Sequence, residues 1–576
     1  MVYKDRLSQW LLKGDEATVA ELSALSDAEL EERFYQELVF GTAGLRGLMG
    51  AGTNRMNLYV LRRATQGLAD YLSSIDGAKA RGVVIAYDSR LNSDVYALET
   101  ALVLANNGIR AYLFESLRAV PQLSFAVRQL KCIAGIVITA SHNPSAYNGY
   151  KVYWEDGGQL GPVQAEEVFA LICKADYFKP SAMNKAEALE KGLLVMVGKA
   201  LDEAYYSATS SLMLESALVR EYGSGLKVVY TPLHGAGRVP VEELLRRVGF
   251  SNVHIVSLQA EPDSSFATVS APNPEEPLAF ALGIELAKSI DADIILATDP
   301  DADRLGLAVK RHDGSYALLT GNQIGCLLLN YMLGSLHAKG SLPKNGLVVK
   351  SIVSTPLAEA ICSRYSIKLE NVLTGFRFIS EKVEYCEATE KCKFLFGFEE
   401  SLGFLAGSFS RDKDAICASM LLAEAAVVYS RKGMTLYDAL GALDEEYGCF
   451  RERVISYTLE GKSGMARLKQ AMTSLRAAPI DCLAGLKVDY FEDYYKGTAV
   501  YAAAAAEKRL ELPKAEMVRV VFEGGAYVIV RPSGTEPKLK LYVGVNAEKS
   551  SQADELLESF AAEAKSLLDR LLAKRE

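Results

Sequence analysis

Residues 82–108 read GVVIAYDSRLNSDVYALETALVLANNG, and this stretch decides the fold. A short run of β-branched and other apolar residues predicts a buried strand, a polar loop follows it, and the remaining residues predict a helix. The same order recurs in LKVVYTPLHGAGRVPVEELLRRVG at 226–249 and in GLVVKSIVSTPLAEAICSRY at 346–365. Continuous apolar strands that alternate with helices are typical of mostly parallel sheets covered on both faces. The sequence therefore predicts repeated α/β domains.

The C-terminal part of the chain follows a different pattern. RERVISYTLEG, MVRVVFEGGAYVIVRP and KLKLYVGVNAE alternate like antiparallel strands, with a turn predicted at Gly524 and Gly525, and an amphipathic helix is expected from about 550 to 572. We expect three α/β domains with mixed, mostly parallel sheets, followed by an α+β domain. The expected ranges are 1–205, 206–315, 316–440 and 441–576.

The composition limits the class of protein. A chain of 576 residues is too long for one hydrophobic core, and 49% hydrophobic with 23% charged residues is ordinary for a globular protein. A net charge of −9 argues against a nucleic-acid or anionic-membrane surface. The first residues lack the features of a signal peptide, and no stretch approaches the about 18 apolar residues of a membrane span. Nine scattered cysteines without a CxxC pair, and five dispersed histidines, argue against a disulfide framework and a zinc site. We therefore expect a cytoplasmic protein.

Residues 135–151, GIVITASHNPSAYNGYK, end an apolar strand at Ser141 and His142. A loop that merely caps the strand would explain the pair, and so would a strand end that exposes a reactive hydroxyl. The segment TASHN excludes the GxSxG motif of lipase-type hydrolases. Lys151 closes the stretch and brings a cationic donor.

The segment ADIILATDPDADRLGLAV places Asp299, Asp301 and Asp303 at alternate positions after a strand. Pro300 excludes a regular helix, and in an extended chain alternate residues point the same way. Three such carboxylates repel one another, by about 1 kcal/mol per pair even in a water-like dielectric at about 4 Å, so a cation is expected among them. Oxygen ligands select a hard ion, and Mg²⁺ fits best. A solvated acidic turn is the alternative. An EF-hand loop is excluded because its sixth position here is Arg304 instead of Gly.

Three further stretches carry polar chemistry. KFLFGFEESLGF places Glu399, Glu400 and Ser401 at a strand end, where they suit vicinal sugar hydroxyls or simply form a polar turn. VIVRPSGTEPKLKLY joins a guanidinium, two hydroxyls and exposed backbone N–H groups in one loop, which is phosphate-binding chemistry or an ordinary turn. FGTAGLRGLMG surrounds Arg46 with glycines but is not the GxGxxG of dinucleotide binding, and a flexible turn is the alternative.

Taken together, TASHNP, DPDADR, GFEES and RPSGTEP occur in the order found in the α-D-phosphohexomutases, and the chain resembles the phosphoglucomutase branch over nearly its whole length. The resemblance implies four domains in a heart-shaped arrangement, each contributing one motif to a central cleft. It also implies an intramolecular phosphotransferase that interconverts glucose 1-phosphate and glucose 6-phosphate.

In the implied cycle, Ser141 is carried as a phosphoserine. It gives its phosphoryl group to a hexose monophosphate, and a glucose 1,6-bisphosphate intermediate returns the other phosphate. The resemblance implies one Mg²⁺ per chain, glucose 1,6-bisphosphate as activator, small-molecule sugar phosphates as partners with no nucleic acid and no membrane, and a monomer or homodimer. The implied catalytic residues are Ser141, His142, Lys151 and Arg46, and the implied metal ligands are Ser141, Asp299, Asp301 and Asp303. The implied substrate-binding residues are Arg304, Thr374, Gly375, Arg377, Glu399, Ser401, Arg531, Ser533, Gly534 and Thr535.

Arg377 differs from the pattern of the family. Many relatives carry a lysine where this chain has Arg377, and an always-charged guanidinium is a poor proton shuttle, so Lys151 would have to supply acid–base catalysis.

Several other functions are compatible with the sequence. Phosphomannomutases and phosphopentomutases of the same family are alternatives. A metal-dependent sugar-phosphate phosphatase is a rival from another class, but a loop for the non-reacting phosphate argues against it. A non-catalytic sensor is disfavoured because the motifs are intact.

Overall fold

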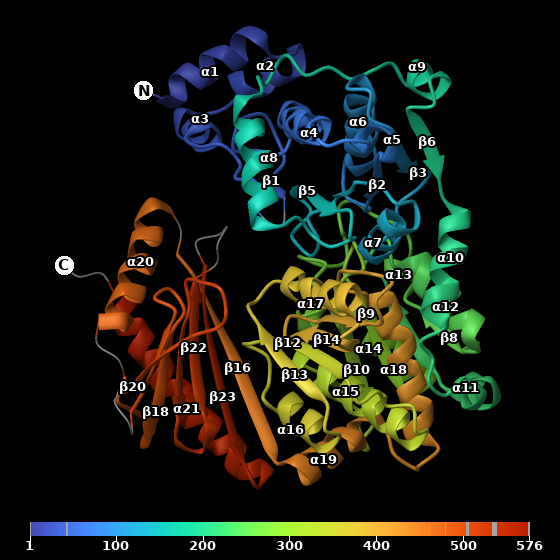
Figure 1. Ribbon diagram of the computed structural model, residues 1–576, viewed down its shortest axis with the longest axis vertical. Coiled ribbons are helices and arrows are strands. Elements are labelled where there is room, and N and C mark those ends of the chain that lie inside the picture. Colours follow the sequence, from blue (N-terminus) through green and yellow to red (C-terminus); the bar gives the residue numbers. More distant parts are fainter. Residues whose placement is uncertain are drawn as a thin grey trace. The chain divides into compact units, whose positions relative to one another are not determined.

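The computed structural model describes residues 2–41, 44–459, 461–477, 480–502, 506–532 and 538–573 (Figure 1). These residues form two compact units. The first comprises Met1–Leu347 and Ile379–Tyr437, and the second comprises Val348–Phe378 and Asp438–Glu576.

Three helices begin the first unit: α1 (Val2–Lys13), α2 (Glu16–Ser23) and α3 (Asp27–Phe34). Asp15 and Ser26 cap the second and third by accepting backbone N–H groups of the first turn, which supplies partners that the helix itself cannot. Trp10 anchors these helices because its ring packs edge-on against Phe34 and Tyr59. The segment therefore shares an aromatic core with the α/β layer that follows.

The first sheet has the strand order β1-β5-β4-β2-β3-β6, in which β4, β2, β3 and β6 run parallel and β1 and β5 are antiparallel to their neighbours. Its strands are β1 (Leu45–Leu48), β2 (Val83–Tyr87), β3 (Ala111–Phe114), β4 (Ala134–Ile138), β5 (Tyr147–Trp154) and β6 (Leu194–Val197). The accompanying helices are α4 (Leu58–Ser73), α5 (Ala78–Arg81), α6 (Ser93–Asn106), α7 (Val120–Gln129), α8 (Pro162–Lys174), α9 (Lys185–Glu190) and α10 (Lys199–Ser210). Val83 and Ile85 pack in the core formed with α4, α6 and α8, whereas Val84 and Ala86 pack with α7. Both faces are covered, which is why the strands read as continuous apolar runs.

The second sheet has the order β11-β10-β9-β7-β8, with β9, β7 and β8 parallel and β10 and β11 antiparallel. Its strands are β7 (Val228–Thr231), β8 (Val253–Ile255), β9 (Ile294–Thr298), β10 (Leu305–Lys310) and β11 (Tyr316–Leu318). The helices of this region are α11 (Ser216–Tyr222), η1 (Gly223–Gly225), α12 (Arg238–Val248), α13 (Ser257–Ala260), η2 (Pro277–Phe280) and α14 (Ala281–Ile290). Val229, Ile295 and Ala308 form its core with Phe280 and Ala287.

The third sheet has the order β13-β12-β14-β15. Its strands are β12 (Gly346–Ser351), β13 (Lys368–Val372), β14 (Lys393–Glu399) and β15 (Gly403–Ala406). The neighbouring helices are α15 (Gly321–Ala338), α16 (Leu357–Arg364), α17 (Phe376–Thr389), α18 (Ala415–Ser430) and α19 (Leu436–Tyr447). Strand β12 is buried along its whole length, as β4 and β9 are in the first two sheets.

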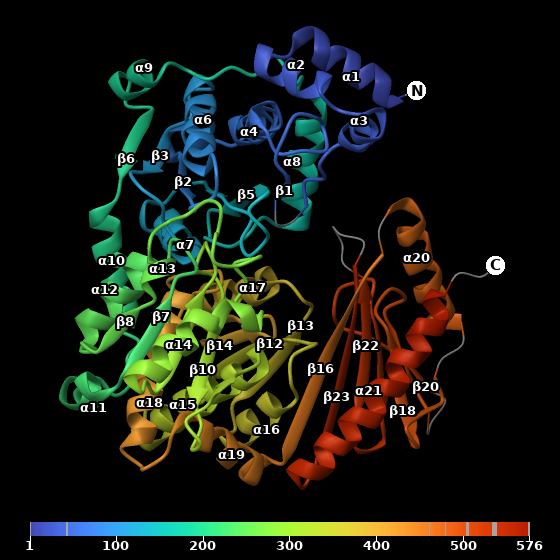
Figure 2. The ribbon, with the colours of Figure 1, turned by 180° about the vertical axis from the view of Figure 1, so that it is seen from behind.

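An antiparallel sheet forms most of the second unit, in the order β16-β23-β22-β21-β18-β19-β20, and β17 pairs with β18. Its strands are β16 (Cys449–Thr458), β17 (Cys482–Leu483), β18 (Leu486–Asp493), β19 (Thr498–Tyr501), β20 (Ala506–Arg509), β21 (Val518–Phe522), β22 (Tyr527–Pro532) and β23 (Lys538–Ala547). The 3₁₀ turn η3 (Glu523–Gly525) joins β21 to β22, and α20 (Gly461–Ala477) and α21 (Ser550–Leu572) are its helices. Figure 2 shows α21 lying along one face of this sheet, where Phe560 and Leu568 share a core with Val528 and Leu541.

The predicted elements are confirmed at all three repeated strand–loop–helix stretches and in the C-terminal domain, where the turn falls at Gly524 and Gly525 and the last helix spans Ser550–Leu572. One cysteine pair departs from the expectation of scattered thiols: Cys386 and Cys392, six residues apart, form a disulfide. Within the described ranges, no helix is both long and apolar enough to cross a membrane.

Candidate active site

Ser141 lies just beyond the carboxyl end of β4 in an unusual backbone conformation. Its φ of 53° is in the left-handed region, which is uncommon for a residue other than glycine and is typical of functional sites. Its backbone N–H donates to Thr139 Oγ1 at 2.8 Å. The sequence predicted an exposed hydroxyl, and this is wrong: Ser141 is only 3% exposed because other segments fold over the strand end.

Arg90 holds the loop that carries Ser141. Its guanidinium donates to the carbonyl oxygens of Ser141 at 2.5 Å, Pro144 at 2.8 Å and Tyr147 at 3.1 Å. Asp88 pairs with Arg90 at 3.2 Å and accepts a hydrogen bond from Thr139 at 2.6 Å. Arginine is suited to this role because its planar fork offers several donors in fixed directions.

The segment that follows β9 gathers three buried carboxylates. One oxygen from each of Asp299, Asp301 and Asp303 lies within 4.8 Å of the others. The sequence argument for this convergence assumed an extended chain, and that assumption is wrong. The segment is a turn in which the N–H of Ala302 donates to the carbonyl of Asp299 at 2.9 Å, and Ala302 has a φ of 49°.

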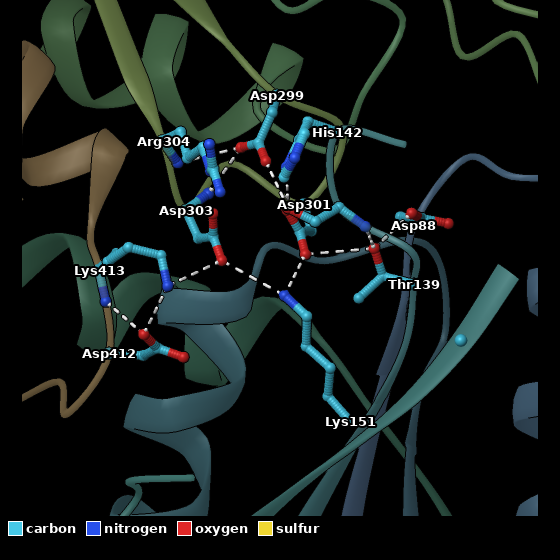
Figure 3. Close-up of polar contacts among 12 residues, drawn as sticks. Asp88, Thr139, His142, Lys151, Asp299, Asp301, Asp303, Arg304, Asp412 and Lys413 are labelled. Atoms are coloured by element: carbon cyan, nitrogen blue, oxygen red, sulfur yellow. Dashed lines mark hydrogen bonds and ion pairs between the residues drawn. The ribbon is translucent and has the colours of Figure 1, made fainter. Parts of the chain in front are cut away.

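Ser141 and the carboxylates meet directly. Ser141 Oγ donates to Asp299 Oδ2 at 2.8 Å. Thr139 Oγ1 lies 3.1 Å from Asp301 Oδ2, and Lys151 Nζ lies 2.8 Å from Asp301 and 3.3 Å from Asp303 (Figure 3). Two segments more than 140 residues apart in the sequence therefore form one polar centre.

The charges of this centre shift its pKa values in opposite directions. Burial, and then the charges of Asp301 and Asp303, raise the pKa of Asp299 well above its ordinary value. Burial opposes ionisation of Asp303 too, but the nearby Lys413 and Lys151 outweigh it and hold its pKa well below the usual range. Such opposed shifts are typical of active sites.

His142 contributes a neutral ring to the centre. Burial, and then the charges of Arg304 and Arg46, lower its pKa well below the ordinary value, so the imidazole is uncharged at pH 7. Its Nδ1 lies 3.2 Å from Ser141 Oγ. A neutral ring can exchange a hydrogen bond with the hydroxyl without adding charge.

Two arginines predicted for the site lie at its edge. Arg46, on β1, donates to Asn143 Oδ1 in the loop of Ser141 at 3.2 Å. The backbone N–H of Arg304 donates to Asp299 Oδ1 at 3.0 Å, and its guanidinium pairs with Glu275 at 2.9 Å.

The predicted sugar-binding loop adjoins the aspartate turn. Glu399 is buried at the end of β14, and Ser401 follows in the turn before β15. A β-bridge between Arg304 and Gly403, together with a hydrogen bond of 3.1 Å from Leu305 N to Leu402 O, joins the two segments. The first unit therefore contains the serine loop, the aspartate turn and the GFEES loop.

The remaining predicted residues belong to the second unit or lie outside the described residues. Thr374 and Gly375 directly precede α17, with Gly375 at a φ of 126°, and Arg377 lies in the first turn of this helix. Arg531 lies in β22. Ser533, Gly534 and Thr535 lie outside the described residues.

Sequence reasoning missed three residues of this centre. Asp88 and Arg90 follow β2, which runs parallel to β4 with Tyr87 opposite Ile138, so their position at the same sheet edge as Ser141 was a usable signal. The third is Lys413, in the stretch RDKDA at the start of α18. The structure places its Nζ 3.2 Å from Asp303.

Comparison with known proteins identifies the class. Models of the phosphoglucomutase/phosphomannomutase family match residues 37–178 (alpha/beta/alpha domain I), 203–314 (domain II), 320–447 (domain III) and 488–563 (C-terminal domain). The chain belongs to the phosphoglucomutase/phosphomannomutase family. Its fold is that of a phosphohexomutase, with three α/β/α domains followed by an antiparallel C-terminal domain.

Individual relatives agree. A phosphoglucomutase of Staphylococcus haemolyticus is 37% identical over 550 residues, which covers 95% of this chain and 97% of that enzyme. The crystal structure of pp63/parafusin, a phosphoglucomutase from Paramecium, has a TM-score of 0.68 at 16% identity and covers 94% of this chain and 97% of that one. An Aspergillus fumigatus N-acetylphosphoglucosamine mutase, solved with GlcNAc-6P and magnesium, has a TM-score of 0.50 at 15% identity and covers 96% of this chain and 100% of that one. The two solved structures establish likeness of fold alone.

Proposed function

We propose that this chain is a phosphoglucomutase that interconverts glucose 1-phosphate and glucose 6-phosphate through a phosphoserine at Ser141. The observation that carries the proposal is the hydrogen bond of 2.8 Å from Ser141 Oγ to Asp299, one member of a buried carboxylate triad. The curated relatives named phosphoglucomutase support glucose as the sugar.

The carboxylate triad fits a divalent cation. Asp301 Oδ1 and Asp303 Oδ1 are buried and have no hydrogen-bond partner among the described residues, which is costly for carboxylate oxygens unless something cationic binds them. We propose that Asp299, Asp301 and Asp303, with an oxygen of phosphorylated Ser141, hold Mg²⁺, the ion with which the Aspergillus mutase was solved. When bound, the ion would neutralise charge on the phosphoryl group.

The protein's own residues supply the rest of the transfer. The bond between Ser141 Oγ and phosphorus breaks while a bond from phosphorus to the sugar oxygen forms. The sugar hydroxyl releases a proton, and Ser141 Oγ ends with one. In the second half of the cycle, the other phosphate of glucose 1,6-bisphosphate returns to Ser141, so protons and phosphoryl groups balance. We assign proton transfer to Lys151 and hydrogen bonding at the reacting oxygens to His142, Arg46 and Arg304.

The remaining assignments follow the four motifs. We propose that Glu399 and Ser401 bind the sugar hydroxyls, with Thr374, Gly375 and Arg377 as further contacts. Arg531, Ser533, Gly534 and Thr535 would bind the phosphate that is not reacting. Free glucose 1,6-bisphosphate would act as activator. When the bisphosphate intermediate dissociates, Ser141 is left without its phosphate, and free glucose 1,6-bisphosphate can phosphorylate it again.

The identity of the sugar is tested by coupled assays with the 1-phosphates of glucose, mannose and ribose. We expect the highest kcat/KM with glucose 1-phosphate. A higher kcat/KM with either of the other two would assign the chain to a phosphomannomutase or a phosphopentomutase activity instead.

If this loop binds the non-reacting phosphate, it must accept the substrate in two opposite orientations, one for each half of the cycle. Arg531→Ala tests that role and separates a mutase from a phosphatase. We expect KM to rise for both glucose 1-phosphate and glucose 6-phosphate, since each presents its non-reacting phosphate to this loop. Hydrogen bonds to charged groups are worth about 1.5–3 kcal/mol, so kcat/KM should fall roughly 10- to 150-fold. Lys538→Ala, in the neighbouring strand β23, is the matched control. An effect on only one substrate would contradict the role, and accumulation of inorganic phosphate would favour the phosphatase.

A further inference from the structure

The loop 407–414, which joins β15 to α18, carries Lys413 into the centre described above. Lys413 is buried, and its Nζ lies 3.2 Å from Asp303 and 3.1 Å from Asp412 Oδ1 (Figure 3). Asp412 Oδ1 also accepts the backbone N–H of Lys413 at 2.8 Å. Asp412 Oδ1 therefore contacts both the backbone N–H and the side-chain ammonium group of Lys413.

The second oxygen of Asp412 is fixed from a different part of the chain. Asp412 Oδ2 accepts hydrogen bonds from the hydroxyl of Tyr153 at 2.8 Å and from Gln159 Nε2 at 2.9 Å. Tyr153 is completely buried. Burial, and then the charge of Asp412, raise the pKa of Tyr153 well above its ordinary value, so the hydroxyl keeps the proton that it donates.

Strand β5 connects both lysines to Asp303. Lys151 and Tyr153 are two residues apart on this strand, so their side chains leave the same face. Lys151 contacts Asp303 directly, and Tyr153 reaches it through Asp412 and Lys413. Strand β5 therefore carries Lys151 itself, and it contacts Lys413 indirectly, through Tyr153 and Asp412.

We propose that Tyr153, assisted by Gln159, is a positioning residue for phosphoryl transfer, which acts by fixing the carboxylate of Asp412 and thereby the ammonium group of Lys413 against Asp303. The proposal rests on the proposed function, because it assigns Lys413 to the phosphoryl group that Ser141 transfers. Without the hydroxyl, the Asp412 carboxylate can rotate and Lys413 loses its defined position. A misplacement of about 1 Å near reacting atoms can cost about 10²-fold in rate.

The loop itself offers a matched control. The hydroxyl of Tyr205, on α10, donates to both oxygens of Asp414 at 2.8 Å. Asp414 also accepts the N–H of Cys417 as the N-cap of α18. Tyr153 and Tyr205 therefore each bind an aspartate of the same loop through a buried hydroxyl. Of these two aspartates, Asp412 contacts the ammonium group of Lys413.

The experiment compares Tyr153→Phe with Tyr205→Phe, which both keep the ring and remove one hydroxyl. We expect Tyr153→Phe to lower kcat about 10- to 100-fold with little change in KM, and Tyr205→Phe to leave kcat within about twofold of wild type. In a Lys413→Met background, Tyr153→Phe should cause no further loss, because residues that act as a unit are not additive. The proposal would be overturned if kcat fell equally in the two variants or stayed unchanged in Tyr153→Phe. It would also be overturned if Tyr153→Phe lowered kcat as much in the Lys413→Met background as in the wild type.

A second measurement does not depend on activity. Labelling with an amine-reactive reagent, followed by peptide mass spectrometry, reports how accessible Lys413 is. We expect increased labelling of Lys413 in Tyr153→Phe and wild-type labelling in Tyr205→Phe, and the reverse pattern or equal labelling would contradict the positioning role. If the wild-type protein turned over no sugar phosphate, the proposed function would fail, and the labelling would still decide whether Tyr153 positions Lys413.

Discussion

Replacing Ser141 with alanine is expected to lower kcat by roughly 10⁴-fold or more, because the substitution removes the atom that carries the transferred phosphoryl group. The hydrogen bond to Asp299 is lost as well, but Ser141 is small and the rest of its loop is held through backbone carbonyls by Arg90, so the fold should be preserved. Steady-state assays with glucose 1-phosphate measure the loss, and thermal unfolding checks the fold.

Ser145→Ala is the matched control for this prediction, since it removes a hydroxyl four residues further along the same loop. Its kcat should equal that of wild type. A Ser141→Ala variant that keeps full activity would refute the assignment of the nucleophile.

Removal of divalent cations is expected to abolish activity, and added Mg²⁺ should restore it. Asp301→Asn should lower kcat roughly 10²-fold or more, since it keeps the shape of the side chain but removes one of three charges that would bind the ion. The variant should also need a higher Mg²⁺ concentration for half-maximal activity. The measurement is a titration of activity against Mg²⁺ after chelation.

Asp313→Asn, in an exposed turn of the same domain, controls for a general change of charge. Its activity should depend on the Mg²⁺ concentration as that of the wild type does. Activity that survives exhaustive chelation would contradict a metal site at the aspartate turn.

Local patterns revealed much of the site. Ser141, Asp299, Asp301 and Asp303 are recognisable because each follows an apolar strand directly, and such a residue is placed at a sheet edge by the strand itself. The repeated strand–loop–helix order likewise indicated three α/β domains, because continuous apolar strands require cover on both faces.

Long-range contacts set the limit of prediction. The burial of Ser141 depends on segments from distant parts of the chain, and the turn at Ala302 depends on a left-handed residue that is not a glycine. Lys413 contacts Asp303, while Tyr153 and Gln159 bind its neighbour Asp412 from a distant part of the chain. No local pattern records a contact between residues more than 250 positions apart.

The central claim is that Ser141 carries the phosphoryl group, and a single-turnover experiment tests it most directly. Protein phosphorylated on Ser141 is mixed with excess glucose 6-phosphate and quenched at short times. The Ser141 peptide is analysed by mass spectrometry, and the sugar phosphates are separated by chromatography. We expect the peptide to lose its phosphate and glucose 1,6-bisphosphate to appear in equal amount, at a rate no slower than kcat. Release of inorganic phosphate in place of the bisphosphate, or steady turnover while the Ser141 peptide never carries phosphate, would contradict the account.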